Sequence, residues 1–231
     1  MNRLAVIGTG RMGLLVSALA PEMGFDVVAT LGRAQTRDGV TRAALAGAEV
    51  AIEFTIAGAA FGMVRACAAL GVPVVSGTTG WDAERVQVES FVRSTTGALL
   101  WAPNFALGAH LFAKVVADAA RRFSRADGGF DSHLVETHHT EKRDAPSGTA
   151  RALAQVAEQA LGRAVPVTSV RVGQVPGTHE MIFDAPFEQV RLVHEARDRR
   201  VFAAGALTAA RWLMGRRGVF TLDDYFGEVG R

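Results

Sequence analysis

The segment from Val135 to Gln155 carries two adjacent histidines, a lysine and a Ser-Gly-Thr sequence that opens a predicted helix. Histidine titrates near neutral pH, so His138 or His139 could give or take a proton during a reaction. Backbone N–H groups at a helix start bind anions, although Ser147 would equally suit an ordinary N-cap. The segment therefore indicates an anionic ligand beside groups that can move a proton.

The two histidines are neighbours on a predicted strand, 131–139, so their side chains point to opposite faces. They cannot form one chelating pair, and we expect separate roles or one structural histidine. Only Lys114 and Lys142 are lysines among the 25 basic residues. Lys142 lies beside the histidines, where a compact ammonium with a tunable pKa is useful. We interpret Lys142 as functional and Lys114, on a helical pattern, as a chance retention.

Elements that could position these residues follow from the hydrophobic pattern. Short apolar runs predict strands at 3–8, 26–31, 49–55, 72–80 and 98–104, alternating with helices at 11–20, 58–70 and 82–94, the last with Asp82 as N-cap. This alternation is typical of a parallel sheet with helices on both faces.

The pattern changes after residue 105. Helices at 107–126 and 148–161 accompany strands at 131–139, 166–172, 178–184 and 188–195, which favours a mixed or antiparallel sheet; a last helix follows at 204–215. We therefore predict an α/β chain with a Rossmann-type parallel sheet (1–105), an inserted α+β mixed-sheet domain (106–203) and a C-terminal segment (204–231) that packs back on the first domain.

A glycine motif, Gly8 to Gly13, lies between the first predicted strand and helix. In G-x-G-x-x-G, Gly8 allows the tight turn, Gly10 lets the backbone approach a pyrophosphate, and Gly13 lets helix and strand pack closely. The motif predicts a dinucleotide site at the helix N-terminus; the alternative is a glycine-rich turn without a ligand.

The end of the second strand, "TLGRAQTR", lacks the acid that usually binds a ribose 2′-hydroxyl. Arg33 could instead pair with a 2′-phosphate, or it is a solvated surface arginine. We expect NADPH to be used at least as well as NADH. The stretches 53–55, 77–79 and 102–105 also follow strands, where ligands of open α/β sheets bind.

Composition narrows the classes of protein. The net charge of +2 implies no field for nucleic acid, and no run of eighteen apolar residues predicts a membrane span. A single cysteine, Cys67, excludes an internal disulfide and a Cys-based zinc site; no metal site is predicted. We interpret Cys67 as a small core residue and expect the protein to work in the reducing cytoplasm.

The segment "ETHHTEKRDAPSGTA" (136–150) closely resembles the signature of the 4-hydroxy-tetrahydrodipicolinate (dihydrodipicolinate) reductases of the diaminopimelate route to lysine. The stretches "RMG", "EFT", "GTTG", "APNFALG", "RVGQVPGTHEMIF" and "FAAGALTAARWL" resemble that family in the same order. The resemblance implies NAD(P)H-dependent reduction of a dicarboxylate with loss of water, and a homotetramer formed through the mixed-sheet domain.

The resemblance also implies residue roles. His138 would be the proton donor or acceptor and Lys142 a second proton donor, with His139, Gly148 and Thr149 binding substrate. Cofactor contacts would come from the glycine loop, Arg33 and two strand ends: Gly8, Thr9, Gly10, Arg11, Met12, Gly13, Arg33, Gly77, Thr78, Thr79, Ala102, Pro103, Asn104 and Phe105.

Departures from the family pattern are a glycine loop one residue shorter, Glu53 in place of Asp, and Gly32 in place of an acid.

Two other functions remain as alternatives. A related amino-acid dehydrogenase would bind NAD(P) without needing the His-His-Lys segment. A non-enzymatic dinucleotide sensor would bind cofactor without turnover.

Overall fold

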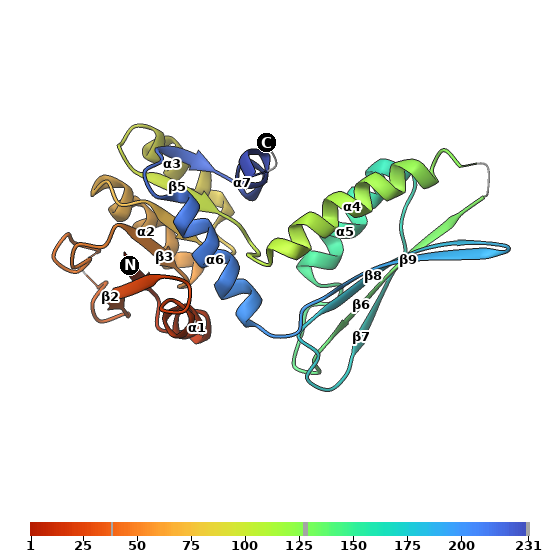
Figure 1. Cartoon of the computed structure of the whole chain (residues 1–231), viewed down its shortest axis with the longest axis horizontal. Helices are drawn as coiled ribbons and strands as arrows, with labels where there is room; N and C mark the ends of the chain where they lie inside the picture. Colours follow the sequence, from red (N-terminus) through yellow and green to blue (C-terminus); the bar gives the residue numbers. More distant parts are fainter. Residues whose placement is uncertain (38, 127–128, 230–231) are drawn as a thin grey trace. The chain divides into compact units, whose positions relative to one another are not determined.

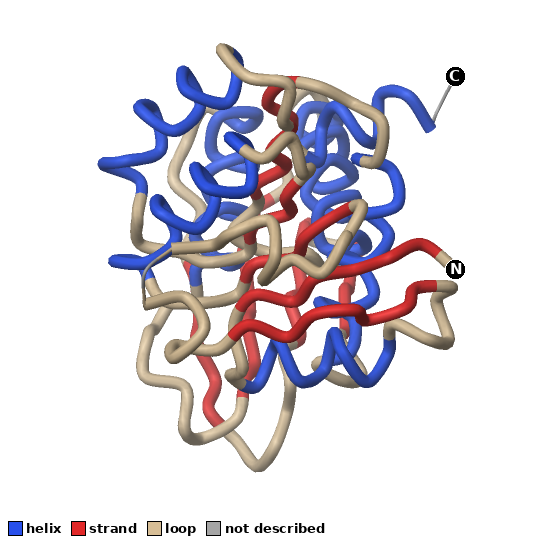
Figure 2. The backbone as a smooth tube through the Cα atoms, turned by 90° about the vertical axis from the view of Figure 1, so that its left-hand side faces the viewer, coloured by secondary structure: helices blue, strands red, loops and turns tan. Residues whose placement is uncertain are grey.

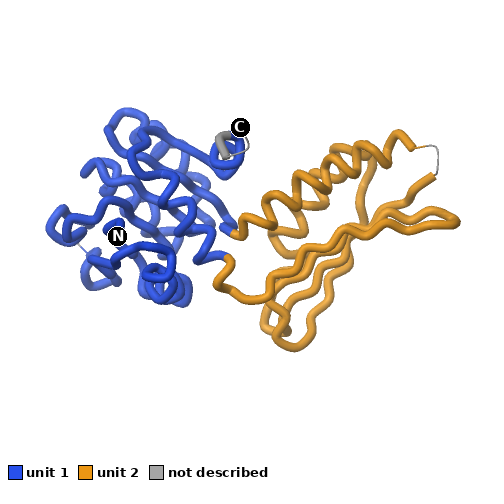
Figure 3. Tube along the Cα trace, in the orientation of Figure 1, with its two compact units in different colours: residues 1–105, 202–231 blue, residues 106–201 orange. Residues whose placement is uncertain are grey.

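The computed structural model describes residues 1–37, 39–126 and 129–229, so the last two residues of the predicted C-terminal segment lie outside it. The chain forms two compact units (Figure 3). Unit 1 comprises Met1–Phe105 and Phe202–Arg231, and unit 2 comprises Ala106–Val201. Each unit has its own sheet and core.

Unit 1 contains a six-stranded parallel sheet in the order β10-β5-β4-β3-β1-β2 (Figure 1). Its strands are β1 (Asn2–Ile7), β2 (Phe25–Leu31), β3 (Val50–Glu53), β4 (Val74–Ser76), β5 (Ala98–Trp101) and β10 (Gly218–Phe220). Its helices are α1 (Arg11–Leu19), α2 (Ala57–Ala69), α3 (Asp82–Arg93), α7 (Leu222–Val229) and most of α6 (Arg200–Leu213). The predicted Rossmann-type sheet is confirmed.

Helices cover both faces of this sheet because its strands are apolar on both sides. Ala5 and Ile7 of β1 are buried with residues of α2 and α3, Cys67 among them. Val6 points to the opposite face, where a Cβ on Gly13 of α1 would lie 3.5 Å from it. The tan loops that leave the strands in Figure 2 carry most of the candidate cofactor residues.

Unit 2 contains a mixed four-stranded sheet in the order β7-β6-β8-β9. Its strands are β6 (Asp131–His138), β7 (Val167–Arg171), β8 (Thr178–Ala185) and β9 (Glu188–Glu195); only β6 and β7 are parallel. Helices α4 (Leu107–Phe123) and α5 (Gly148–Leu161) lie side by side over one face (Figure 1). The predicted mixed sheet is confirmed.

Alternation decides which residues of this sheet are buried. Leu134, Met181 and Phe183 enter the core beneath α4 and α5, and Phe183 stacks on Phe123 with ring centroids 4.3 Å apart. The opposite face remains open within the chain, with Val170 and Val193 37% and 55% exposed. Ser147 caps α5 and Gly162 ends it in the left-handed conformation, so this helix has the predicted bounds.

Some local predictions were wrong. Trp81, not Asp82, is the N-cap of α3. Helix α6 begins at Arg200 rather than at 204, because the charged stretch before it conceals the start. The short strand β10, which pairs with β5, and the helix α7 were not predicted, since three residues give too little periodicity. No helix among the described residues is long and apolar enough to cross a membrane.

Candidate functional site

The glycine turn after β1 has the geometry that a close-approach loop needs. Gly8 has φ +114°, and a Cβ there would lie 2.0 Å from the Phe54 carbonyl oxygen. A Cβ on Gly13 would lie 1.9 Å from the Gly8 oxygen. Gly10 differs, because its Cβ would meet nothing within 4 Å. Gly8 and Gly13 are therefore required by the fold, whereas the space over Gly10 is open to a ligand.

A hollow of about 320 Å³ opens beside this turn. Gly10 is the N-cap of α1, and no side chain caps the helix, so its first N–H groups are available to an anion. The lining comes from the glycine turn and the ends of β3 and β4: Gly10, Arg11, Met12, Phe54, Thr55, Ile56, Ala57, Gly77, Thr78 and Thr79. Six of these are predicted cofactor residues, and Phe54 and Thr55 belong to the strand end 53–55 where a ligand was expected. Ile56 and Ala57 extend this wall.

A buried carboxylate stiffens the same wall. Glu53 is fully buried and accepts hydrogen bonds from the hydroxyls of Ser76 (2.6 Å), Thr78 (2.6 Å) and Thr55. The Thr78 carbonyl accepts from the indole N–H groups of Trp81 and Trp101, at 2.8 and 3.0 Å. The longer side chain at Glu53 therefore joins the ends of β3 and β4 instead of entering the hollow.

The other predicted cofactor residues lie near strand ends without lining the hollow. Arg33 is exposed in the turn after β2. Ala102 and Phe105 are buried after β5, and the Phe105 ring packs edge-on against Phe54 with centroids 6.3 Å apart. Pro103 is exposed at the same strand end. The remaining members are Thr9, exposed beside the glycine turn, and Asn104, half-buried after β5.

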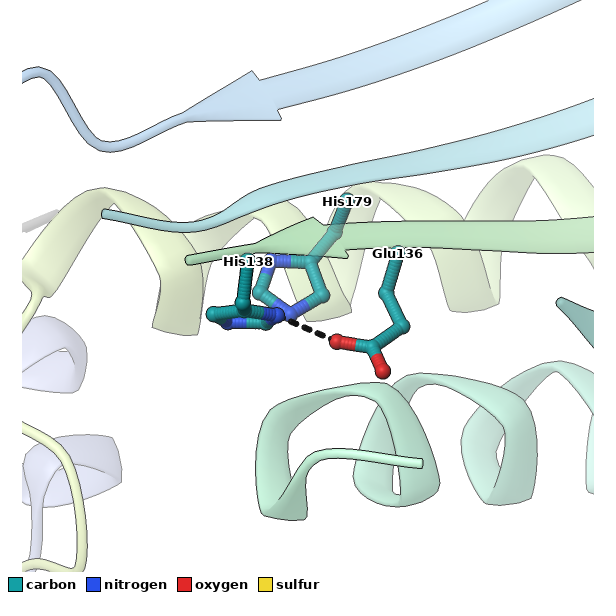
Figure 4. Close-up of side chains that lie close together, drawn as sticks. All are labelled: Glu136, His138 and His179. Carbon is teal, nitrogen blue, oxygen red and sulfur yellow. Dashed lines mark ion pairs between the residues drawn. The ribbon is translucent and has the colours of Figure 1, made fainter. Parts of the chain in front are cut away.

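Unit 2 carries a polar row across its sheet. Glu136 of β6 pairs with Ser169 of β7 and with His179 of β8, and His179 pairs with His194 of β9. Directly paired residues share a face, so the row lies on the covered face. Figure 4 shows Glu136, His138 and His179 pointing toward one another. His138, two residues after Glu136 on the same strand, completes the cluster.

Glu136 is fully buried, and four groups approach its carboxylate. Its Oε2 contacts His138 Nδ1, while its Oε1 accepts from Arg171 Nη2 at 2.7 Å and from the Ser147 N–H at 3.3 Å. Burial alone would raise the pKa of Glu136. Hydrogen bonds from Ser169 and Arg171, with the charges of His138 and Arg171, lower the pKa to about 2. The carboxylate is therefore ionised at neutral pH.

His138 is held on two sides. Its side chain is 9% exposed, with Nδ1 against Glu136. A Cβ on Gly177 would lie only 2.9 Å from His138 Nε2, so glycine is needed there for the ring to fit. Burial lowers the pKa of His138, with Lys142 and Arg171 acting in the same direction and Glu136 opposing them. Burial and these opposing charges together set the affinity of the ring for a proton.

The loop after β6 carries Lys142. Its ammonium donates to Asp144 Oδ1 at 2.7 Å, which lowers the pKa of Asp144, and its side chain is 23% exposed. Arg171 donates to the backbone carbonyls of Lys142 (3.2 Å) and Asp144 (2.6 Å) and so ties this loop to β7. His139 is half-buried just beyond β6, and its backbone N–H donates to Val175.

The N-terminus of α5 begins beside this loop. Ser147 Oγ accepts from the Ala150 N–H at 3.1 Å and lies 3.3 Å from His179 Nε2. Burial, followed by the charge of His138, lowers the pKa of His179 to about 4. The neutral ring can therefore accept a hydrogen bond from the Ser147 hydroxyl. Gly148 and Thr149 are the first residues of the helix, with Gly148 exposed. Ser147 is thus the N-cap of α5, as expected of an ordinary capping serine.

Glu136, His138 and His179 also form the one group of metal-ligating side chains found among the described residues, with ligand atoms within 4.8 Å of one another. Their surroundings favour proton chemistry over a metal ion. Arg171 already neutralises Glu136, and Lys142 adds a second positive charge near His138. A divalent cation would be repelled by both.

Sequence reasoning assigned no role to Glu136, Arg171, Gly177 or His179. Two of them had a readable signal, because "ETH" and "THE" alternate on predicted strands and place Glu136 and His179 on buried faces. The pairing that makes them direct neighbours depends on the β6–β8 register, which the sequence does not specify.

Comparisons with known proteins cover both units. Residues 2–105 match the family described as "Dihydrodipicolinate reductase, N-terminus", and residues 108–226 match "Dihydrodipicolinate reductase, C-terminus". A 4-hydroxy-tetrahydrodipicolinate reductase of Thiobacillus denitrificans is 35% identical over 97% of this chain and 98% of its own. One of Natronomonas pharaonis is 36% identical over 97% and 99%.

A solved structure shows the same fold. The dipicolinate-bound dihydrodipicolinate reductase of Paenisporosarcina sp. TG-14 has a TM-score of 0.79 at 22% identity, covering 96% of this chain and 98% of its own. The identity of the full-length relatives and the match of both family halves lead to one conclusion: the chain belongs to the dihydrodipicolinate reductase family.

Proposed function

We propose that this protein reduces 4-hydroxy-tetrahydrodipicolinate to tetrahydrodipicolinate with NAD(P)H, in the diaminopimelate route to lysine. The observation that carries the proposal is the cluster of His138, Lys142 and the α5 N-terminus on one edge of unit 2. The reaction takes up a hydride and a proton, and the substrate hydroxyl leaves as water together with a hydrogen from the neighbouring ring carbon. The protein must therefore hold two carboxylates and supply a proton.

The residues of unit 1 fit a dinucleotide. Open space over Gly10, the uncapped start of α1 and the hollow beside them suit a pyrophosphate and an extended ligand. When bound there, the reduced nicotinamide would supply the hydride. Gly8–Gly13 and Gly77–Thr79 would hold the cofactor, with Ala102–Phe105 at the neighbouring strand end.

The residues of unit 2 divide the remaining work. His138 delivers the proton, since an imidazole can act as a general acid. Lys142, now paired with Asp144, exchanges that partner for a substrate carboxylate and acts as a second proton donor. The N–H groups of Gly148 and Thr149 bind a carboxylate at the helix start, and His139 contacts the substrate.

We propose that NADPH is used at least as well as NADH. Gly32 leaves no acid at the end of β2 to repel a 2′-phosphate, and Arg33 is exposed there to pair with one.

We further propose a homotetramer built through the open face of the unit 2 sheet. Val170, Val172 and Val193 are 37%, 50% and 55% exposed, which suits a face covered by another copy. A cytoplasmic location is supported by Cys67, which is free and buried. With a net charge of +2, nucleic acid is not expected as a partner.

The test is oxidation of NADPH and of NADH, with the substrate generated in place from pyruvate and aspartate semialdehyde by the preceding enzyme. Substrate-dependent oxidation is the expected result. Cofactor binding without such oxidation would reject the reductase and favour a dinucleotide sensor. Oxidation with an amino-acid product instead would favour a related dehydrogenase.

A further inference from the structure

Glu136 begins the segment that carries the histidines, yet the proposed reaction gives it no task. It is fully buried, and a buried carboxylate persists only when its surroundings stabilise the charge. Besides Ser169 of β7, the partners of Glu136 connect it to three parts of the candidate site: the ring of His138, the start of α5 and, through Arg171, the loop of Lys142.

The first connection fixes a histidine. Because Glu136 Oε2 is ionised and contacts His138 Nδ1, it favours the form of the ring with a proton on Nδ1. Nε2 is then the atom at which the ring gains and gives up its exchangeable proton. The same arrangement orients the catalytic histidine of hydrolases that use a buried acid.

The second connection fixes the anion site. The backbone N–H of Ser147 donates to Glu136 Oε1 at 3.3 Å, and Ser147 is the N-cap of α5. The position of the Gly148 and Thr149 N–H groups therefore depends on the same carboxylate.

The third connection passes through Arg171. This arginine donates to Glu136 Oε1 at 2.7 Å and to the carbonyls of Lys142 and Asp144 at 3.2 and 2.6 Å. One guanidinium thus joins the carboxylate to the loop of the lysine, in a geometry that a lysine in its place could not reproduce.

We infer that Glu136 is the positioning residue of the site, which through its two oxygens sets the tautomer of His138 and aligns it with the α5 N-terminus and the Lys142 loop. This inference rests on the proposed function for its catalytic consequence. The orientation of His138 itself can be measured without any substrate.

A charged or titratable side chain faces His138 from each element packed around it. Glu136 comes from its own strand, Lys142 from the following loop, Arg171 from β7, and His179 from β8. Glu136 is the group that raises the pKa of His138, whereas Lys142 and Arg171 lower it. Removal of Glu136 should therefore lower the pKa of His138, and removal of Arg171 should raise it.

The experiment is nitrogen NMR of histidine-labelled protein, with His138 assigned by its loss in His138→Gln. In the wild type, the neutral ring should carry its proton on Nδ1. In Glu136→Gln, the amide oxygen should stay with the Arg171 and Ser147 donors, so the NH₂ group faces His138 Nδ1. That tautomer should then be lost, and the pKa of His138 should fall. Arg171→Gln should raise it. Glu158→Gln is the control, since Glu158 binds the Val165 N–H from α5 and a glutamine oxygen can still accept it.

Kinetics give the second readout. Glu136→Gln should lower kcat by about 100-fold or more and move the alkaline limb of the kcat/KM profile to lower pH, with cofactor affinity unchanged. The inference is overturned if the His138 tautomer persists in Glu136→Gln, or if turnover stays normal after the tautomer changes. If Glu136→Gln does not fold, a neutral wild-type His138 ring that carries its proton on Nε2 overturns it. A wild-type protein without reductase activity would instead reject the proposed function, while the tautomer still reports on Glu136.

Discussion

Glu136 and His179 are direct partners in the antiparallel pairing of β6 and β8, and both hold Ser147. Glu136 accepts the Ser147 backbone N–H, and the hydroxyl of Ser147 lies 3.3 Å from His179 Nε2. Two buried side chains from adjacent strands thus fix the first turn of α5. The position of this helix start is therefore set by the sheet as well as by the loop that precedes it.

Ser147→Ala should weaken both the helix and the ligand site. Loss of an N-cap costs about 1 kcal/mol of unfolding free energy, and loss of the His179 partner should raise KM for the substrate. Chemical denaturation and steady-state kinetics measure the two effects. Ser124→Ala is the control, because Ser124 ends α4 in an exposed turn. Equal KM values in the two variants would contradict the role of Ser147.

His138→Ala should lower kcat by roughly 10²- to 10⁴-fold, the contribution of a general acid. Binding of NADPH, measured by fluorescence, should remain normal because the glycine turn lies in the other unit. Turnover near the wild-type rate would remove His138 from the mechanism.

Gly10→Ala and Gly8→Ala should separate ligand binding from folding. The Gly10 methyl group would meet no protein atom within 4 Å, so Gly10→Ala should fold normally yet bind NADPH at least about 10-fold more weakly. In Gly8→Ala, the new Cβ would collide with the Phe54 carbonyl, and the φ of +114° at this position favours glycine. This variant should therefore be less stable. Titration calorimetry and thermal unfolding distinguish these outcomes. Undiminished NADPH affinity in folded Gly10→Ala would argue against a pyrophosphate at this turn.

Arg33→Ala should weaken NADPH about 10-fold while leaving NADH nearly unchanged, because only NADPH carries the 2′-phosphate that a guanidinium binds. Kd values for both cofactors measure this. A parallel loss for the two would show that Arg33 does not read the phosphate.

His179 should make the protein sensitive to acid. Its pKa in the folded state is about 4, below the ordinary value of 6.5, so the unfolded chain binds more protons between these pH values. The neutral His179 ring therefore contributes its full stabilisation above pH 6.5. As the pH falls, the free energy of unfolding decreases, by about 2 kcal/mol at pH 5. Urea unfolding at pH 7.5 and 5 should therefore show a smaller difference in His179→Gln than in the wild type. An identical difference would mean that other groups cause the acid sensitivity.

Much of this architecture could be predicted because its signals are local. The strand, glycine turn and helix from Asn2 to Leu19 lie in one continuous stretch, and Ser147 and Gly162 mark both ends of α5. The site of unit 2 depends on contacts distant in sequence. Arg171 meets Glu136 from 35 residues away, and β10 pairs with a strand more than one hundred positions earlier. Periodicity reveals which residues are buried but not which of them meet.

The division of the chain has a practical consequence for protein engineering. The cluster of Glu136, His138 and His179 belongs to one uninterrupted stretch, Ala106–Val201, whereas the glycine turn and its hollow belong to the remainder. A chimera that exchanges the stretch for a homologous one needs only two junctions. The first follows Phe105, and the second falls inside α6. The chimera should therefore take all of Arg200–Leu213 from one of the two proteins. Helix α6 then forms from residues that already occur together in a single natural sequence.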